Sequence, residues 1–197
     1  MKKFLVIPFL ALLLFLFGYP QSAEAINITP LDNIQQALNN HSSVTLTEGT
    51  YNTNFTIKIA AYKELIFEQG ARIIYSGSGS AIKLENGGNP DWAVSQFVIR
   101  RPQIETIQSG VVGLDLTHGF QGTIYEPIIT ADIGIEIDNA NTIKIIGGGV
   151  LVPKSAARTM GTRGIRIAKT AITNNLQIEV HEISDYDVNV EIGKSDG

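Results

Sequence analysis

Three tetrapeptides decide the fold of this chain: Gly113-Leu114-Asp115-Leu116, Gly134-Ile135-Glu136-Ile137 and Gly164-Ile165-Arg166-Ile167. In each, two apolar residues flank one charged residue, which is the alternation of a half-buried strand, and the preceding glycine indicates a turn. Looser copies stand before and after them, at Ala81-Ile82-Lys83-Leu84 and Asp187-Val188-Asn189-Val190. The first apolar residue of the phrase recurs at steps of 32, 21, 30 and 23 residues, so the sequence predicts stacked repeats that bury their apolar faces against neighbours.

A second phrase, two apolar residues five positions apart, falls between the copies of the first. It reads Ile99 to Ile104, Ile124 to Ile129, Ile145 to Val150 and Ile178 to Ile183. Two or three short strands per repeat, joined by loops of uneven length, predict an all-β protein: a right-handed single-stranded parallel β-helix of about five to six coils. One interior column should then contain Ile82, Leu114, Ile135, Ile165 and Val188, and another Ile99, Ile124, Ile145 and Ile178.

The amino-terminal stretch has the composition of an export signal. Lys2 and Lys3 precede an apolar run from Phe4 to Phe17, and Ala23-Glu24-Ala25 is a small-x-small cleavage site. This order is typical of a secretory signal peptide over residues 1–25, and the run is shorter than the roughly 20 residues of a membrane span. We therefore expect a secreted, extracellular protein without stable membrane insertion, whose single domain comprises residues 26–197.

The composition of residues 26–197 fits a sheet protein. They contain 27 Ile and only 9 Leu, and β-branched Ile favours strands where Leu favours helices. Their 13 Lys and Arg against 18 Asp and Glu give a net charge of −5, which offers no electrostatic basis for binding nucleic acid. The chain has no Cys, so an exported domain has to be stable without disulfide bonds.

One segment of the domain is predicted to be helical, and it is short. Asp32 is the expected N-cap, with Gln35 three residues later as in a capping box, and the helix should end at Asn39-Asn40. Ile34, Ala37 and Leu38 share one face and would close the first coil.

Three consecutive segments carry a resemblance to a known group: DNIQQAL (32–38), VTLTEGTY (44–51) and LIFEQGARI (65–73). They resemble the amino-terminal cap of the pectate-lyase-like right-handed parallel β-helix superfamily (the pectin lyase fold), and the repeats extend the resemblance to about residue 192. The resemblance implies a fold and not one reaction, because pectate lyases, polygalacturonases, other polysaccharide lyases, phage tailspikes and surface adhesins share it. The four motifs of polygalacturonase-like hydrolases are absent from the sequence.

The outward position of the first phrase predicts a charged patch. Parallel coils place equivalent residues about 4.8 Å apart, so that Asp115, Glu136 and Asp138 should crowd together with Arg166 on the next coil. Such carboxylates suit Ca²⁺, and the arginine suits the carboxylate of an acidic sugar. The alternative is a plain solvated face on which Lys83 offsets Asp115 and Arg166 offsets Glu136.

The second phrase predicts another substrate-binding group. Arg100 and Tyr125 occupy equivalent outward positions, and an arginine beside an aromatic ring can hold an acidic sugar. Trp92, in the longest gap within a repeat, is a further candidate for a groove wall. His41, His118 and His181 share no metal-ligand spacing, which argues against a zinc site.

Three functions remain open. The first is a secreted β-helix protein that binds polysaccharide, in particular acidic polysaccharide, or a surface ligand on an outward sheet face, without chemistry of its own. The second is a small or truncated polysaccharide lyase or glycoside hydrolase, and the third is a structural or adhesive module that recognises protein. Residues 188–197 contain no capping helix, so either the protein self-associates at this end or the reading frame is a truncated relative of a longer enzyme.

Overall fold

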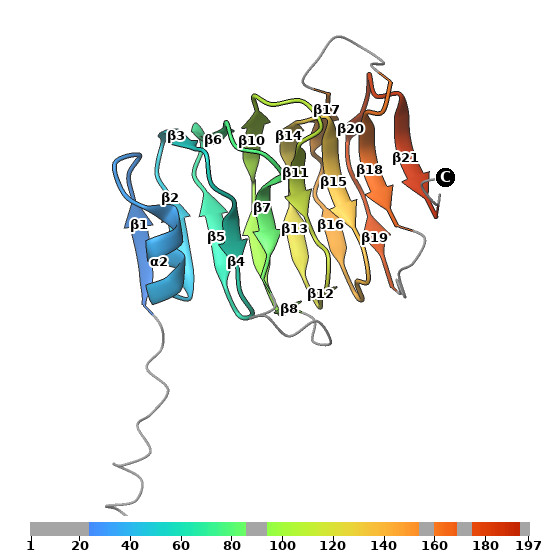
Figure 1. Ribbon diagram of the computed structural model, residues 1–197. Coiled ribbons are helices and arrows are strands. Elements are labelled where there is room, and N and C mark those ends of the chain that lie inside the picture. Colours follow the sequence, from blue (N-terminus) through green and yellow to red (C-terminus); the bar gives the residue numbers. More distant parts are fainter. Residues whose placement is uncertain (1–23, 86–93, 154–159, 169–174, 194–197) are drawn as a thin grey trace, which may run out of the picture.

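The computed structural model describes residues 24–85, 94–153, 160–168 and 175–193. These residues form three long parallel sheets, one two-stranded parallel sheet and one short helix. The three sheets run side by side along one axis, from the helix at one end to β21 at the other (Figure 1). The all-β class and the parallel strands predicted from the sequence are confirmed.

The strands of each sheet follow one another in the order of the sequence. Sheet A contains β1 (Ala25–Ile28), β2 (Ser43–Leu46), β5 (Glu64–Phe67), β9 (Val98–Arg100), β13 (Thr123–Tyr125), β16 (Lys144–Ile146) and β19 (Gln177–Ile178). Sheet B contains β3 (Gly49–Thr53), β6 (Ala71–Tyr75), β10 (Gln103–Thr106), β14 (Ile128–Thr130), β17 (Val150–Val152) and β20 (Glu182–Ile183). Sheet C contains β4 (Ile57–Ile59), β7 (Ser80–Leu84), β11 (Val112–Asp115), β15 (Ile133–Ile137), β18 (Arg163–Ile167) and β21 (Val188–Ile192), while β8 (Val94–Ser95) pairs with β12 (Gly119–Phe120).

The described chain passes through sheets A, B and C in turn, six times between β2 and β21. Each strand pairs in parallel with the strand of the circuit before and the circuit after, as β11 does with β7 and β15. A stack of such circuits is compatible with a parallel β-helix.

The interior columns predicted from the two phrases are present. In sheet C, Ile82, Leu114, Ile135 and Ile165 are partners in register, and all four are 0% exposed. In sheet A, the column consists of Ile99, Ile124 and Ile145, all 0% exposed, followed by the half-buried Ile178. Apolar residues on the inward side of all three sheets therefore form one continuous core.

The predicted end of the sheet C column was wrong by two residues. Val190, not Val188, is the partner of Ile165, and Val188 pairs with Arg163. A shift of two residues leaves the alternation of inward and outward side chains unchanged, so hydrophobic pattern alone does not fix this register. As a consequence Glu191, and not Asn189, follows Arg166 in the outward column.

The glycine that precedes each strand phrase serves close packing and not the predicted turn. Gly113, Gly134 and Gly164 lie within or beside strands of sheet C, and none of them has a positive φ. A Cβ atom at Gly134 would lie 2.5 Å from the carbonyl oxygen of Gly164, and one at Gly164 would lie 2.5 Å from the carbonyl oxygen of Asn189. These positions require glycine because the backbones of successive strands approach each other closely there.

The helix α2 (Ile34–Asn40) covers the amino-terminal end of the stack, as expected, with Ile34, Ala37 and Leu38 buried. Its N-cap is Asn33, whose side chain accepts a hydrogen bond from the Gln36 N–H at 3.0 Å. The prediction of Asp32 as N-cap was wrong, because the Asp32 carboxylate instead accepts from the N–H and the hydroxyl of Thr29, both at 2.8 Å.

Gln35 does not complete a capping box either. Its side chain exchanges two hydrogen bonds with the backbone of Lys58, accepting from the N–H at 2.7 Å and donating to the carbonyl at 3.1 Å. Lys58 belongs to β4, the first strand of sheet C, so Gln35 ties the helix to the free edge of that sheet.

The predicted leader lies almost entirely in residues 1–23, outside the described residues. Glu24 and Ala25 are exposed, at the start of β1 on the edge of sheet A. None of the helices in the described part of the chain has the length and apolar character needed to cross a membrane.

We expect the exported protein to begin at Ile26, because cleavage after Ala25 removes only one exposed residue from an edge strand. The intact mass of protein recovered from the medium of an exporting host measures this directly. Recovery of the uncut chain in the membrane fraction would contradict the prediction.

We expect Ile135→Asn to lower the free energy of unfolding by about 3 kcal/mol or more, because it places an amide among interior side chains of adjacent circuits. Ile128→Asn is the matched control, because Ile128 lies on the outward side of sheet B and is 46% exposed. Urea denaturation followed by circular dichroism measures both. Equal losses in the two variants would contradict the assigned register.

Candidate functional site

The outward face of sheet A carries an arginine and a tyrosine in direct contact. Arg100 on β9 and Tyr125 on β13 are partners in register, as the sequence predicted. The guanidinium carbon of Arg100 lies 4.6 Å from the centroid of the Tyr125 ring, a cation–π contact. Arg100 also donates from Nε to Glu64 Oε1 at 2.7 Å, and Glu64 lies on β5, one circuit earlier.

Glu64 fixes the position of this arginine. The hydrogen bond to Glu64 raises the pKa of Arg100, more than burial lowers it, and the charges of Glu64 and Tyr125 add to the rise. With its Nε held by the carboxylate and its plane over the ring, the guanidinium is presented in one orientation. The side chain of Arg100 is 42% exposed, and a guanidinium is a donor that suits a carboxylate or sulfate group.

The bend that follows each strand adds two more charged residues. Arg101 after β9 and Glu126 after β13 have φ values of 53° and 49°, in the left-handed region that side chains other than glycine seldom adopt. Their N–H groups donate to the carbonyls of Tyr125 and Ile146 in the next circuit, at 2.8 and 2.9 Å. This hydrogen bonding repeats the same bend from circuit to circuit and places both side chains beside Arg100 and Tyr125.

A recess of about 320 Å³ lies among these residues and is lined by Arg100, Arg101, Tyr125 and Glu126. Arg101 is exposed and forms no ion pair within the described part of the chain. Lys144, two circuits beyond β9 on the same face, is likewise exposed and unpaired there. The recess therefore combines one oriented guanidinium, one guanidinium without an ion pair, an aromatic ring and the carboxylate of Glu126. Arg101 and Glu126 follow Arg100 and Tyr125 directly in the sequence, which already places them beside this pair, and the bends bring their side chains to the same recess.

The outward column of sheet C is a ladder of charges, in the register Lys83, Asp115, Glu136, Arg166, Glu191. Lys83 Nζ lies 3.3 Å from Asp115 Oδ2, and Arg166 Nη2 lies 2.6 Å from Glu136 Oε1. Asp115 is 5% exposed and also accepts from Ser80 Oγ and from the N–H of Thr117. Each of the two carboxylates thus has a cation of its own, as the alternative of a paired face predicted, but Asp115 is buried and not solvated.

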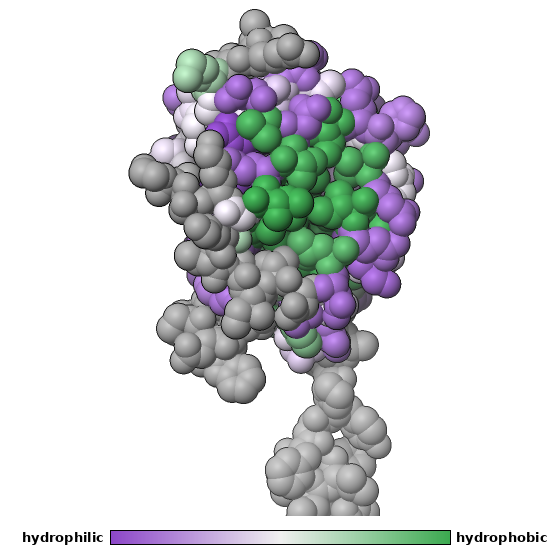
Figure 2. Space-filling model, turned by 90° about the vertical axis from the view of Figure 1, so that its right-hand side faces the viewer, coloured by the Kyte–Doolittle hydropathy of each residue, from purple (hydrophilic) through white to green (hydrophobic). Residues whose placement is uncertain are grey.

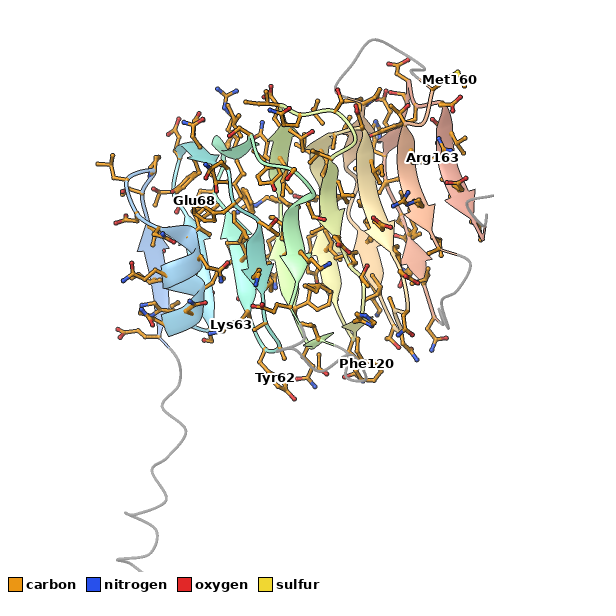
Figure 3. The ribbon with its side chains drawn as sticks, in the orientation of Figure 1. Tyr62, Lys63, Glu68, Phe120, Met160 and Arg163 are labelled. Carbon is orange, nitrogen blue, oxygen red and sulfur yellow. The ribbon has the colours of Figure 1, made fainter. Side chains whose placement is uncertain are left out.

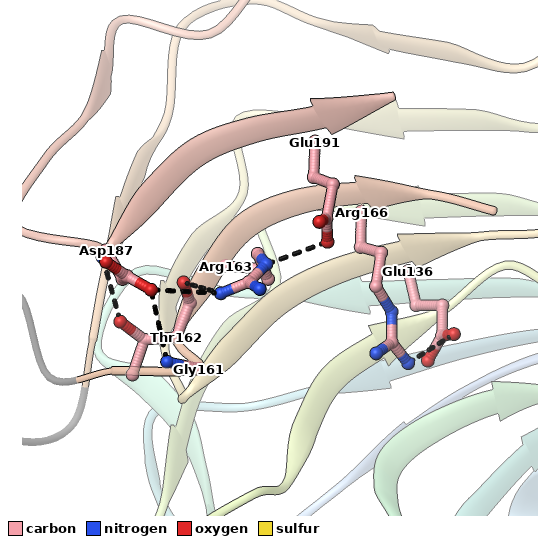
Figure 4. Close-up of polar contacts among 7 residues, drawn as sticks. All are labelled: Glu136, Gly161, Thr162, Arg163, Arg166, Asp187 and Glu191. Atoms are coloured by element: carbon pink, nitrogen blue, oxygen red, sulfur yellow. Dashed lines mark hydrogen bonds and ion pairs between the residues drawn. The ribbon is translucent and has the colours of Figure 1, made fainter. Parts of the chain in front are cut away.

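Sheet C continues into a second ion-pair network that the sequence analysis did not identify (Figure 4). Arg163 donates from Nε to Glu191 at 2.7 Å, and its Nη1 lies 3.4 Å from Asp187. Asp187 accepts from the N–H of Gly161 at 3.2 Å and donates its own N–H to the Thr162 hydroxyl at 3.0 Å. This network was not predicted because the predicted register of β21 was wrong by two residues. Only the pairing of Arg166 with Glu191 brings Glu191 within reach of Arg163.

The calcium site predicted from Asp115, Glu136 and Asp138 stays a prediction, and the geometry of the described residues gives it no support. Among the described residues, no three His, Asp or Glu side chains lie where they could hold a metal ion. His41 Nδ1 lies 3.2 Å from the carbonyl of Glu24, and the Asn139 amide donates to His118 Nδ1 at 3.1 Å. The histidines are therefore separate from one another.

Trp92 lies outside the described residues. Two other aromatic side chains, Tyr62 and Phe120, mark one edge of the stack, where Figure 3 shows them projecting from the lower rim. They are linked through Ser95, which accepts from the Tyr62 N–H and pairs with Phe120. Tyr62 is 66% exposed, and its φ is 61°, in the bend before β5. The pattern of apolar residues in the sequence does not predict this bend.

Comparison of the chain with known protein families, curated proteins and solved structures finds no match. The geometry of the chain itself therefore carries the assignment of function.

We expect millimolar Ca²⁺ to leave the melting temperature unchanged in the wild-type protein and in Glu136→Gln. Glu136 would have to give up Arg166 to bind the ion, and loss of that pair in the variant costs about 1 kcal/mol of stability with or without calcium. Differential scanning calorimetry with and without the ion measures both effects. A calcium-dependent rise in the wild-type protein that Glu136→Gln abolishes would contradict this and restore the calcium site.

Proposed function

We propose that this chain is a secreted right-handed parallel β-helix of six coils, related to the pectate-lyase-like superfamily, that binds an acidic polysaccharide on the outward face of sheet A. The strand order A, B, C repeated along the chain, the helix at the amino-terminal end and the resemblance of residues 32–73 support the fold assignment. The signal-like residues 1–25 support secretion.

The observation that carries the binding proposal is the Arg100–Tyr125 contact beside the unpaired Arg101. An anionic sugar needs a cation for its carboxylate or sulfate and an apolar surface for its ring carbons. Arg100 is oriented by Glu64 and its side chain is 42% exposed, and Arg101 adds a guanidinium that forms no ion pair among the described residues, although Glu126 lines the same recess. One face of Tyr125 is covered by Arg100, so the ring contributes its edge and hydroxyl to the recess.

The arrangement favours a polymer over a small molecule. The recess is open and shallow, with exposed residues from two circuits, and further outward side chains of sheet A follow at about 4.8 Å intervals along the axis. Lys144 lies in this direction, and an extended chain that reaches from Arg100 and Arg101 at β9 to Lys144 on β16 would cross the intervening strand β13. Each contact is exposed and individually weak, so that affinity depends on several subsites bound together.

The proposal assigns no reaction to the chain. The recess holds one carboxylate without an ion pair, Glu126, and the described residues place no second unpaired acid beside it. A pair of carboxylates at fixed separation is the usual requirement for glycoside hydrolysis. A polysaccharide lyase is the alternative function.

We expect Arg101→Ala to weaken binding to polygalacturonate about tenfold, the value of one charge-assisted hydrogen bond. Arg72→Ala is the matched control, because Arg72 is an exposed arginine on sheet B that also forms no ion pair within the described residues. Affinity electrophoresis in gels with and without the polymer, and calorimetric titration, measure the effect. Retardation that is equal in the two variants, or equal with a neutral polymer, would contradict the proposal.

The same protein incubated with polygalacturonate and Ca²⁺ distinguishes binding from lyase activity. A lyase produces unsaturated uronide ends and a steady rise in ultraviolet absorbance, whereas a binding protein produces none. We expect retardation without absorbance change.

A further inference from the structure

The carboxyl-terminal end of the stack presents a broad apolar surface. Figure 2 views the molecule from this end and shows a continuous hydrophobic area bordered by hydrophilic residues. Val190 and Ile192 of β21 are 44% and 73% exposed, whereas their partners Ile165 and Ile167 on β18 are 0% and 9% exposed. The residues of the last circuit that pack only partly against the core are Leu176, Ile178, Val180 and Ile183.

The strand edges at this end are also open. In the part of the chain that the structure describes, β19, β20 and β21 are the last strands of sheets A, B and C, each paired on one side only. Unpaired N–H and C=O groups beside exposed apolar side chains are a template for pairing with another strand.

We propose that this end binds the same end of a second copy of the chain, through antiparallel pairing of β21 with β21 of the second copy. Two-fold symmetry about Val190 places Val190 opposite its own copy, Val188 opposite Ile192 and Asn189 opposite Glu191. The first two pairs are apolar, and the third joins an exposed amide to a carboxylate. No pair in this register sets like charges against each other.

The opposite end of the molecule does not fit the apolar surface. Helix α2 turns its apolar side inward and leaves Gln36, Asn39 and Asn40 exposed. Contact between unlike ends would bury these amides against aliphatic side chains without hydrogen-bond partners. Pairing of like ends avoids this cost and closes after two copies, so it yields a dimer and not a filament.

The acidic residues around this end make the stability of the proposed dimer depend on ionic strength. Residues 175–193 contain five acids, Glu179, Glu182, Asp185, Asp187 and Glu191, and no Lys or Arg. Arg163 binds two of them, Asp187 and Glu191, nearest the proposed strand pair. The other three leave the rims of both copies negative, so the dimer is weak at low ionic strength and strengthens as salt screens the repulsion.

Analytical ultracentrifugation of the exported protein over a range of concentrations, in about 20 mM and about 500 mM NaCl, tests the proposal. We expect a monomer–dimer equilibrium whose dissociation constant is about tenfold lower in the higher salt. A monomer at every concentration in both buffers, or a dimer that dissociates as salt is added, would overturn it.

Matched variants locate the contact. Val190→Asn should weaken the dimer about tenfold or more, whereas Ile128→Asn, at 46% exposure on the outward side of sheet B, should leave it unchanged. Ile192→Asn repeats the test at a side chain 73% exposed, whose replacement leaves the core intact if Val190→Asn unfolds the last strand. Equal dimerisation in the Ile192→Asn and Ile128→Asn proteins would overturn the proposed interface.

Two glutamate variants test the effect of the acidic residues around this end. Glu182→Gln should strengthen the dimer in low salt, because it removes one charge from each rim, whereas Glu105→Gln, exposed on sheet B, should not. Neither residue belongs to the polysaccharide recess, so loss of the dimer and loss of polysaccharide binding remain distinguishable.

Discussion

Stacking of inward side chains from one circuit onto the next is the constraint on which the rest of this structure depends. A strand of three to five residues has little stability alone, and it is held here by burial against the strands of the circuits above and below. β-Branched isoleucine suits such columns, because its stiff side chain packs well against an identical neighbour on a pleated surface. Ile99, Ile124 and Ile145 form such a column without interruption.

The same register that aligns the interior also aligns the outer surface. Outward side chains of neighbouring strands lie about 4.8 Å apart, so each column has to alternate in charge, remain neutral or bind something that neutralises it. Sheet C satisfies this internally, through Lys83 with Asp115 and Arg166 with Glu136. Sheet A does so only in part, because Glu64 neutralises Arg100 while Arg101 has no such partner among the described residues. Because sheet A, unlike sheet C, leaves an arginine without an ion pair among the described residues, we place the proposed binding surface on sheet A.

The sequence predicts the parts of the fold that follow from the alternation of inward and outward residues along a strand. It does not predict the register between neighbouring strands or the residue that caps the helix. The period of two places Leu114 and Ile135 inward and Asp115 and Glu136 outward, and the structure agrees. A shift by two residues preserves that pattern, which is why the partner of Ile165 was placed at Val188 and not Val190. The two neighbouring caps Asp32 and Asn33 are both good N-cap residues, and the competing hydrogen bonds of Asp32 with Thr29 decide between them.

The contacts of the candidate site that the sequence did not reveal depend on backbone conformation. Arg101 and Glu126 occupy left-handed bends, as Gly147 does in the next circuit, where its φ is 89°. Glycine would be the favoured residue at all three positions, since side chains there add strain. The spacing of apolar residues places Arg101 and Glu126 next to Arg100 and Tyr125, but it does not reveal the left-handed bends that orient them.

The first and last circuits of the stack each lack a neighbouring circuit on one side, and the two ends differ in what covers that side. At the amino-terminal end α2 satisfies its own backbone hydrogen bonds and supplies an apolar face, so the first circuit is covered. At the other end the ring of Tyr186 packs against Gly164, but its hydroxyl is buried without a described partner, and burial together with the Asp132 charge raises its pKa. Because the stability of a repeat protein is a sum over neighbouring interfaces, a circuit with one neighbour is the least stable. The recess on β9 and β13 lies where each circuit has two neighbours, and this position gives a binding site built from short strands the rigidity it needs.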